Sequence, residues 1–198
     1  METLSIIEWA GTLTGITCVA LQARARIAAW PIGIVSVALY AWFFWQIRLY
    51  ADAGLQVFYI ATGFYGWWHW SRGGSEASEA PITTLGNGAR LVVVLVAGAA
   101  AWGIGRFLSG TDASLPYWDA FTTTFSIAGQ LLLMRKVYEN WMLWIVVDTV
   151  AIGVYYVKEA YVTCGLYAVF LGIAVWGLLH WRALLREQGE SGATLAAA

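Results

Sequence analysis

Long apolar stretches alternate with short polar breaks along this chain. A helix that crosses a bilayer needs about 17–25 mostly apolar residues. The stretches of suitable length cover residues 4–21, 29–47, 52–70, 89–108, 117–134, 140–157 and 161–181. In lipid every backbone polar group must be hydrogen-bonded internally, so we expect these stretches to be helices. Runs such as Leu91–Ala100 lack the two-residue alternation of a transmembrane strand. The pattern therefore predicts an all-α membrane protein with seven transmembrane helices.

The composition supports a protein embedded in a lipid bilayer and argues against several other classes. Hydrophobic residues make up 60% of the chain and charged residues 12%, whereas soluble domains average roughly 45–50% and about 25%. The net charge of −1 gives no basic patch, so we expect no nucleic-acid partner. Cys18 and Cys164 lack the Cys/His spacing of a metal site, so no metal or cofactor is expected. No catalytic motif is present, and we do not expect an enzyme.

The distribution of Lys and Arg predicts the orientation in the membrane. Seven spans place the N-terminus and three loops on one side, with Arg48, Arg106 and Lys158. The opposite side carries the other eight basic residues, namely Arg24, Arg26, Arg72, Arg90, Arg135, Lys136, Arg182 and Arg186. Cytoplasmic loops carry the excess of positive charge. We therefore expect the N-terminus outside and the C-terminus in the cytoplasm.

The chain also contains an internal repeat. Shifting the sequence by 111 residues, which aligns Trp30 with Trp141, gives about 14 identities over residues 1–70, where roughly 5 are expected by chance. Both histidines of the chain, His69 and His180, align with each other. The repeat recurs after four spans, an even number, so the two copies are expected to run in parallel. The predicted organisation is a three-helix repeat (1–72), a linker with the fourth helix (73–111), a second repeat (112–183) and a disordered cytoplasmic tail (184–198). Parallel 3+1+3 repeats are typical of transporters with a substrate site near the midplane.

Candidate binding residues lie in the span 140–157. Helical spacing places Asn140, Trp144 and Asp148 on one stripe, with Trp141 beside Trp144 and Tyr155 two turns beyond Asp148. A carboxylate inside a span is costly and usually functional. Trp rings could stack on a flat substrate ring, Asn140 could hydrogen-bond a polar edge, and Asp148 could counter a positive charge. The structural alternative is that Asp148 belongs to a local hydrogen-bond network and that Trp141 lies at the membrane interface.

The matching segment of the first repeat contributes further candidates. Trp30 aligns with Trp141, and Ser36 and Tyr40 are four residues apart, so their hydroxyls could line the same cavity. Gly33 and Val37 occupy the positions of Trp144 and Asp148 in the second repeat. The predicted site is therefore asymmetric, as binding one asymmetric molecule requires.

The sequence resembles the PnuC family of bacterial vitamin transporters over about residues 5–182. The specific motifs are WPIGIVSVALY (30–40), LYADAGLQVFY (49–59), YGWWHW (65–70) and ENWMLWIVVD (139–148) followed by YYVKEAYVTCGLY (155–167). The resemblance implies a SWEET-like 3+1+3 fold, commonly a homotrimer in the inner membrane. It also implies facilitated uptake of nicotinamide riboside, which cytoplasmic phosphorylation traps, while relatives carry thiamine or riboflavin. Asn140, Trp141 and Trp144 match the family's substrate-binding stripe.

Two kinds of alternative remain open. Nicotinamide riboside and thiamine carry a fixed ring cation, which suits Trp faces and a nearby carboxylate, whereas riboflavin is neutral and would depend on stacking. A different class is a membrane scaffold subunit whose repeats only pack together. A scaffold predicts apolar packing along the facing stripe and no vitamin binding.

Overall fold

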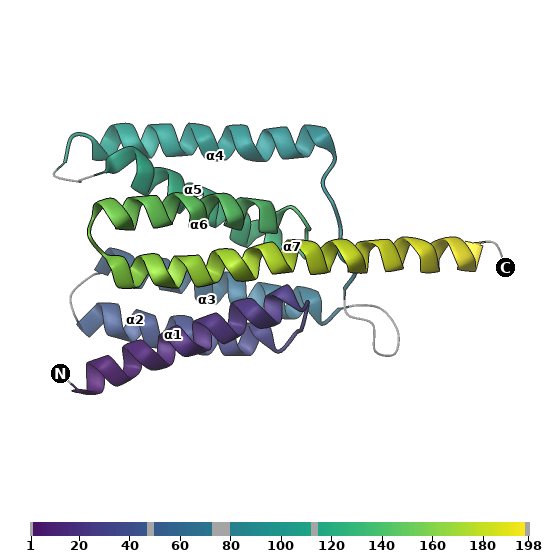
Figure 1. Ribbon diagram of the computed structural model, residues 1–198, viewed down its shortest axis with the longest axis horizontal. Coiled ribbons are helices and arrows are strands. Elements are labelled where there is room, and N and C mark those ends of the chain that lie inside the picture. The colour runs from purple at the N-terminus through teal and green to yellow at the C-terminus, as the bar shows by residue number, and fades with distance from the viewer. Residues whose placement is uncertain (1, 47–49, 73–79, 112–114, 197–198) are drawn as a thin grey trace. The chain divides into compact units, whose positions relative to one another are not determined.

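The computed structural model describes residues 2–46, 50–72, 80–111 and 115–196, and this part of the chain folds into seven α-helices without a β-strand (Figure 1). The helices are α1 (Glu2–Ala23), α2 (Ala29–Gln46), α3 (Tyr50–Trp70), α4 (Asn87–Leu108), α5 (Pro116–Leu133), α6 (Asn140–Val157) and α7 (Tyr161–Ala196). The prediction of an all-α protein with seven helical segments is confirmed. Pro116 lies at the start of α5, where its missing N–H costs no helical hydrogen bond.

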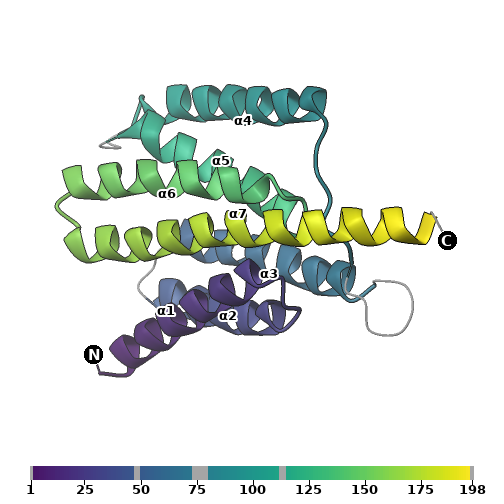
Figure 2. The same ribbon diagram turned by 45° about the vertical axis from the view of Figure 1, so that its right-hand side comes forward.

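The helices form two compact units, which we call the N-terminal unit (Met1–Pro81) and the C-terminal unit (Ile82–Ala198). In the N-terminal unit α1 packs on α2 and α2 packs on α3. In the C-terminal unit α4, α5, α6 and α7 pack on one another in chain order, as two views of the chain show (Figures 1 and 2). Helix α4 therefore belongs with α5–α7. The expected boundary between the first repeat and the linker falls at 73–79, outside the described residues.

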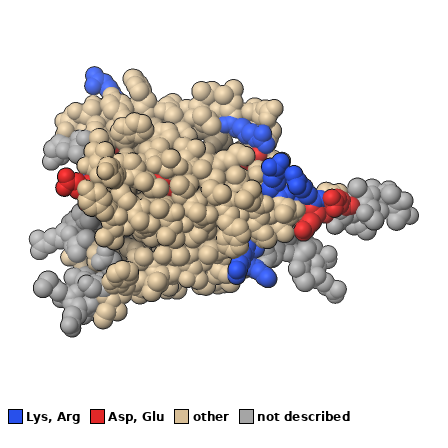
Figure 3. Space-filling view, in the orientation of Figure 1, with Lys and Arg blue, Asp and Glu red and all other residues tan. Residues whose placement is uncertain are grey.

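The outer surfaces of the helices are strongly apolar. Helix α4 exposes large side chains such as Val96, Trp102 and Phe107 and buries only Ala97, Ala101 and Gly105. Such a surface is stable in lipid and would be costly in water. On the face shown in Figure 3, charged side chains gather near the helix ends and leave the surface between them almost uncharged.

By length and composition alone, three of the described helical stretches are long and apolar enough to cross a membrane. They are Asn87–Leu108, Asn140–Val157 and Tyr161–Glu190, and Ala29–Phe43 forms a shorter apolar helix. Helices α1, α3 and α5 carry more polar residues along their length. Their assignment as spans, like that of α2, stays a prediction that rests on the apolar stretches of the sequence.

Three helix ends share one backbone motif. Ala25, Lys136 and Glu159 adopt left-handed backbone with φ of 56°, 56° and 57°. In each case this residue's N–H donates to the carbonyl three residues back, and the next N–H donates to the carbonyl five back, as from Arg26 to Leu21 at 2.9 Å. These are the hydrogen bonds of a Schellman motif, which ends a helix and reverses the chain. Ala25 and Lys136 are 111 residues apart, so the first connection of each repeat has the same geometry.

The two repeats also share one core contact. Trp30 and Trp70 meet edge to face with ring centroids 5.2 Å apart and planes at 85°, and Trp141 and Trp181 do so at 5.5 Å and 86°. All four side chains are fully buried. An edge-to-face pair adds roughly 0.5–1.5 kcal/mol beyond the burial of its apolar area. The same pair therefore stabilises the core of each unit at corresponding positions.

Helix α7 is longer than the sequence pattern predicted. It runs from Tyr161 to Ala196, so the segment expected to be a disordered tail from residue 184 is helical in this structure. The prediction of disorder relied on the small and polar residues there. However, Leu, Arg, Glu, Gln and Ala are strong helix formers, and no proline interrupts the helix beyond the predicted membrane span.

Candidate substrate-binding site in the C-terminal unit

The first turn of α6 holds Asn140 in a fixed position. Its side chain is 0% exposed, and its Nδ2 donates to the carbonyl of Val137 at 2.7 Å. Its Oδ1 is buried and has no hydrogen-bond partner among the described residues. An unpaired buried carbonyl is costly unless a donor from water or a ligand reaches it. Asn140 therefore retains an unused acceptor at the start of α6.

Trp141 packs between α6 and α7. Its ring lies over Gly177, where an added Cβ would be 2.7 Å from Cε2 of the indole, and it contacts Trp181 edge to face. The indole is only 1% exposed, and its Nε1 has no partner among the described residues. In this structure Trp141 is a buried contact between helices.

Trp144 points towards the neighbouring helix on the other side, α5. Its Cε2 would lie 3.2 Å from a Cβ built on Gly129, and it packs against the buried cluster that contains Phe125 and Val147. The small residue on α5 makes room for the indole. Trp141 and Trp144 thus contact α7 and α5 respectively, although they are three residues apart on α6.

The corresponding contact in the N-terminal unit has the opposite arrangement of sizes. Gly33 of α2 occupies the position of Trp144, and a Cβ there would lie 2.7 Å from Sγ of Cys18, which occupies the position of Gly129. In the first repeat the larger residue is Cys18, on α1, whereas in the second repeat it is Trp144, on α6. The repeats therefore keep the helix contact while differing in which helix carries the larger side chain.

Asp148 and Tyr155 complete the predicted residues on α6. Asp148 is 3% exposed, and no hydrogen bond or ion pair joins it to another residue in the described part of the chain. A role of Asp148 in substrate binding stays a prediction. In the last turn of α6, Tyr155 stacks on Tyr167 of α7 with centroids 5.3 Å apart and planes at 21°.

The predicted residues of the N-terminal unit are engaged in helix packing. Trp30 lies against Gly66 and Trp70. Ser36 is buried, and its hydroxyl donates to the carbonyl of Gly11 at 2.8 Å. The hydroxyl of Tyr40 lies 2.7 Å from Oγ1 of Thr12 on α1. Within this unit the two hydroxyls connect α2 to α1, and a role of these residues in substrate binding stays a prediction.

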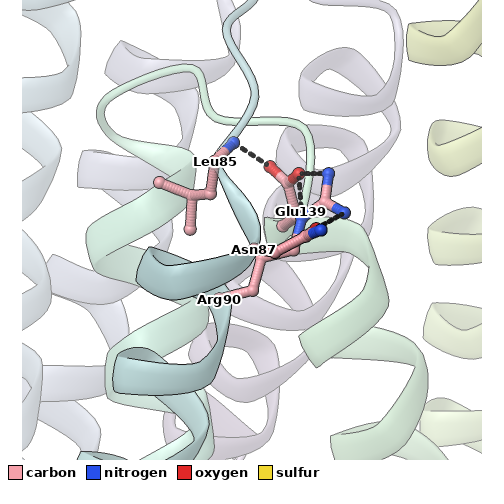
Figure 4. A network of polar contacts seen from close by, with 4 residues as sticks. All are labelled: Leu85, Asn87, Arg90 and Glu139. Atoms are coloured by element: carbon pink, nitrogen blue, oxygen red, sulfur yellow. Dashed lines mark hydrogen bonds and ion pairs between the residues drawn. The ribbon is translucent and has the colours of Figure 1, made fainter.

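Sequence patterns did not single out Glu139, which precedes Asn140. Its side chain is 6% exposed, and its carboxylate accepts hydrogen bonds from Arg90 Nη2 at 2.6 Å, Arg90 Nε at 3.0 Å and the N–H of Leu85 at 3.1 Å (Figure 4). Glu139 lies between the predicted spans 117–134 and 140–157, so the sequence indicated only a polar loop residue at this position. An acidic residue next to a binding motif was the available signal, and only the fold shows that Arg90 reaches it.

Apolar helices that hold aromatic, amide and carboxylate groups inside predicted spans are typical of helical membrane transporters, and the family and relatives of this chain place it in that class. The chain belongs to the nicotinamide mononucleotide transporter family, whose model matches residues 5–183. The resemblance to PnuC transporters noted in the sequence is thereby confirmed. Among the described residues, no group of three or more His, Cys, Asp and Glu could hold a metal ion.

Similar proteins cover almost the whole chain. The nicotinamide riboside transporter PnuC of Escherichia coli (strain K12) is 29% identical over an alignment of 213 residues, which covers 94% of this chain and 89% of that protein. The riboflavin/roseoflavin transporter RibM of Streptomyces davaonensis is 24% identical over 96% of this chain and 90% of its own length. A crystal structure of the vitamin B3 transporter PnuC superposes with a TM-score of 0.75 at 26% identity, covering 92% of this chain and 83% of that one.

Proposed function

We propose that this protein takes up nicotinamide riboside by facilitated diffusion across the bacterial inner membrane, with trapping by cytoplasmic phosphorylation. The observation that carries the proposal is the match, over nearly the full length, to relatives named nicotinamide riboside transporters. The agreement with the fold of a vitamin B3 transporter supports it. No nucleotide-binding motif is present, so a substrate gradient maintained by phosphorylation supplies the driving force.

The chemistry of α6 supports a substrate with a flat, positively charged ring. Helix α6 carries the aromatic rings of Trp141 and Trp144, and Asp148 lies one turn beyond Trp144. Trp faces attract cations most strongly among aromatic side chains. The nicotinamide ring of the proposed substrate carries a fixed positive charge and an amide, and the free acceptor of Asn140 suits such an amide. These residues are our proposed contacts, together with Tyr155, Trp30, Ser36 and Tyr40.

The proposed arrangement is a parallel 3+1+3 repeat with the N-terminus outside, the C-terminus in the cytoplasm and three copies in a homotrimer. The shared Schellman motif and the shared tryptophan pairs support the repeat. The excess of Lys and Arg in one set of loops supports the orientation. A C-terminal fusion to a reporter that is active only in the cytoplasm should give signal. An active periplasmic reporter at the same position would overturn the orientation.

Riboflavin is the second candidate substrate, because a relative named riboflavin/roseoflavin transporter aligns over 96% of this chain. Riboflavin is neutral and larger, so it would bind by stacking and would not depend on Asp148. Thiamine, which has a ring cation, is the third. These substrates differ in charge and size, so they make different demands on the same residues.

Titration of the purified protein with the three vitamins tests the proposal. We expect saturable quenching of Trp fluorescence, because two Trp rings lie on α6, with nicotinamide riboside bound more tightly than thiamine or riboflavin. Tighter binding of riboflavin would make riboflavin the substrate, and the protein would still be a vitamin transporter. Absence of binding of all three would favour the scaffold alternative, which needs no ligand. Uptake into vesicles that is insensitive to an uncoupler would support facilitated diffusion over proton coupling.

A further inference from the structure

The start of α4 is joined to the start of α6 by an ion pair between half-exposed Arg90 and the buried carboxylate of Glu139. We propose that Arg90 and Glu139 form a positioning pair that holds the substrate-binding end of α6 in place, so that substrate affinity depends on the linker that leads into α4. This inference rests on the proposed function, because it concerns residues that we assign to the substrate. It assigns a role in binding to a helix that carries none of the predicted contact residues.

Three hydrogen bonds hold the carboxylate of Glu139 in place. Arg90 donates to Oε1 from both Nε and Nη2, and the backbone N–H of Leu85 donates to Oε2 (Figure 4). Arg90 is itself held by Asn87, whose Oδ1 accepts from Nη1 at 3.3 Å. Hydrogen bonds from a guanidinium to a carboxylate are about twice as strong as neutral ones. The carboxylate is therefore held in one orientation by the linker and the first turn of α4.

A second contact joins the same two segments through the backbone. The N–H of Thr83 donates to the carbonyl of Lys136 at 3.0 Å, and the N–H of Tyr138 donates to the carbonyl of Thr83 at 2.8 Å. These bonds form an isolated parallel bridge between Thr83 and Val137. The linker thus pairs with the α5–α6 connection just before Glu139, and side chain and backbone reinforce one contact.

The backbone of Glu139 is hydrogen-bonded to the first turn of α6, which carries the proposed site. Its own carbonyl accepts hydrogen bonds from the N–H groups of Met142 and Leu143, at 3.1 and 3.3 Å, in the first turn of α6. Asn140 and Trp141 lie in that turn. A shift of Glu139 must therefore move the residues that we assign to substrate. The aligned position in the first repeat is Ala28, whose side chain cannot accept such hydrogen bonds. A corresponding ion pair therefore cannot form in the first repeat.

The opposite end of α6 offers a matched control. Lys158, which follows α6, donates to Asp119 of α5 at 3.0 and 3.2 Å, and both side chains are about one-third exposed. This second ion pair also joins α6 to a neighbouring helix. It lies beside Tyr155, at the end of α6 that carries neither Asn140 nor Trp141. If α6 needed only general stabilisation, loss of either pair would have the same effect on binding.

The first experiment compares nicotinamide riboside affinity in Arg90→Ala, Arg90→Lys and Lys158→Ala. We expect Arg90→Ala to weaken binding about five- to tenfold, in the range of a residue that acts through its neighbours. Arg90→Lys keeps the charge and should recover part of the affinity, while Lys158→Ala, which acts near Tyr155 alone, should weaken binding much less than Arg90→Ala. Equal affinity in Arg90→Ala and Lys158→Ala would overturn the proposal. If Arg90→Ala fails to fold, Arg90→Lys against Lys158→Ala makes the same comparison.

The second experiment needs no substrate, so it tests the positioning role of Arg90 and Glu139 separately from the proposed transport function. Amide hydrogen exchange should become about tenfold faster in residues 140–146 of Arg90→Ala and stay unchanged in residues 152–157. Lys158→Ala should show the reverse. Unchanged exchange in residues 140–146 would overturn the positioning role. A wild-type protein that binds no vitamin would instead overturn the proposed function, and exchange would still decide whether the pair holds α6.

Discussion

Gly177 of α7 lies directly beneath the indole of Trp141, so close that a Cβ at this position would be 2.7 Å from Cε2 of the ring. The aligned pair in the N-terminal unit is closer still, since a Cβ on Gly66 would be 2.3 Å from Cη2 of Trp30. Both tryptophans are buried and have little room to shift. The absence of a side chain at these two glycines is what allows each ring to lie between its helices.

Replacing this glycine with alanine should therefore destabilise the protein. We expect Gly177→Ala to cost about 1–3 kcal/mol, the usual range for overpacking a filled core. Gly172→Ala on the same helix is the control, because a Cβ there meets nothing within 4 Å and alanine favours a helix. Thermal unfolding in detergent measures both variants. A Gly177→Ala protein as stable as Gly172→Ala would show that the Trp141 ring can move aside.

Gly129 should affect substrate affinity through Trp144. A Cβ at Gly129 would lie 3.2–3.6 Å from three atoms of the indole, so Gly129→Ala should tilt the ring slightly. We expect about five- to tenfold weaker nicotinamide riboside binding, since a ring that stacks on substrate must keep its orientation. Gly153→Ala on α6 meets no neighbour within 4 Å and should bind normally.

A double variant makes the Gly129 prediction specific. Trp144→Phe removes the part of the indole that would crowd the added Cβ, so its effect and that of Gly129→Ala should be less than additive. Strict additivity of the two losses in affinity would mean that Gly129 acts independently of Trp144. The affinities are measured by titration calorimetry on the purified protein.

Asp148→Asn should reduce uptake of a cationic vitamin with little effect on expression. The substitution keeps the shape of the side chain and removes its charge, and this carboxylate has no ion-pair partner among the described residues. We expect at least about tenfold slower nicotinamide riboside uptake, because the neutral amide would no longer counter the positive charge of the substrate ring. Asp119→Asn, at the exposed end of α5, is the control. Normal uptake by Asp148→Asn would assign the carboxylate to folding.

Glu159→Gly should stabilise the turn between α6 and α7. Glu159 has a φ of 57°, which glycine adopts without the steric cost that a Cβ brings, and its side chain is exposed. We expect a gain of about 1 kcal/mol. Glu159→Ala separates backbone from charge, because it removes the carboxylate and keeps the Cβ. Equal melting temperatures of the two variants would exclude relief of backbone strain as the cause.

Much of the fold was predictable because membrane helices must satisfy their own hydrogen bonds. Wherever the structure describes it, each predicted span lies within a helix apart from a terminal residue such as Met134, and the span 140–157 coincides with α6. The length of α7 was not predicted, because hydropathy reports where a helix leaves lipid and says nothing of where it ends. Glu139 was not predicted either, since its partner Arg90 is 49 residues away in the sequence.

By itself the sequence determined the helices, the 111-residue repeat and the candidate residues of α6, because hydropathy, identity and helical spacing can be read along the chain. Only the tertiary structure decided which neighbour each residue contacts: Trp141 faces α7, Trp144 faces α5, and Ser36 bonds to α1. It also decided that α4 is joined to α6 through Arg90 and Glu139. Such contacts depend on how helices rotate and pack against one another, and side-chain size at the contact, as at Gly129 and Gly177, sets that packing.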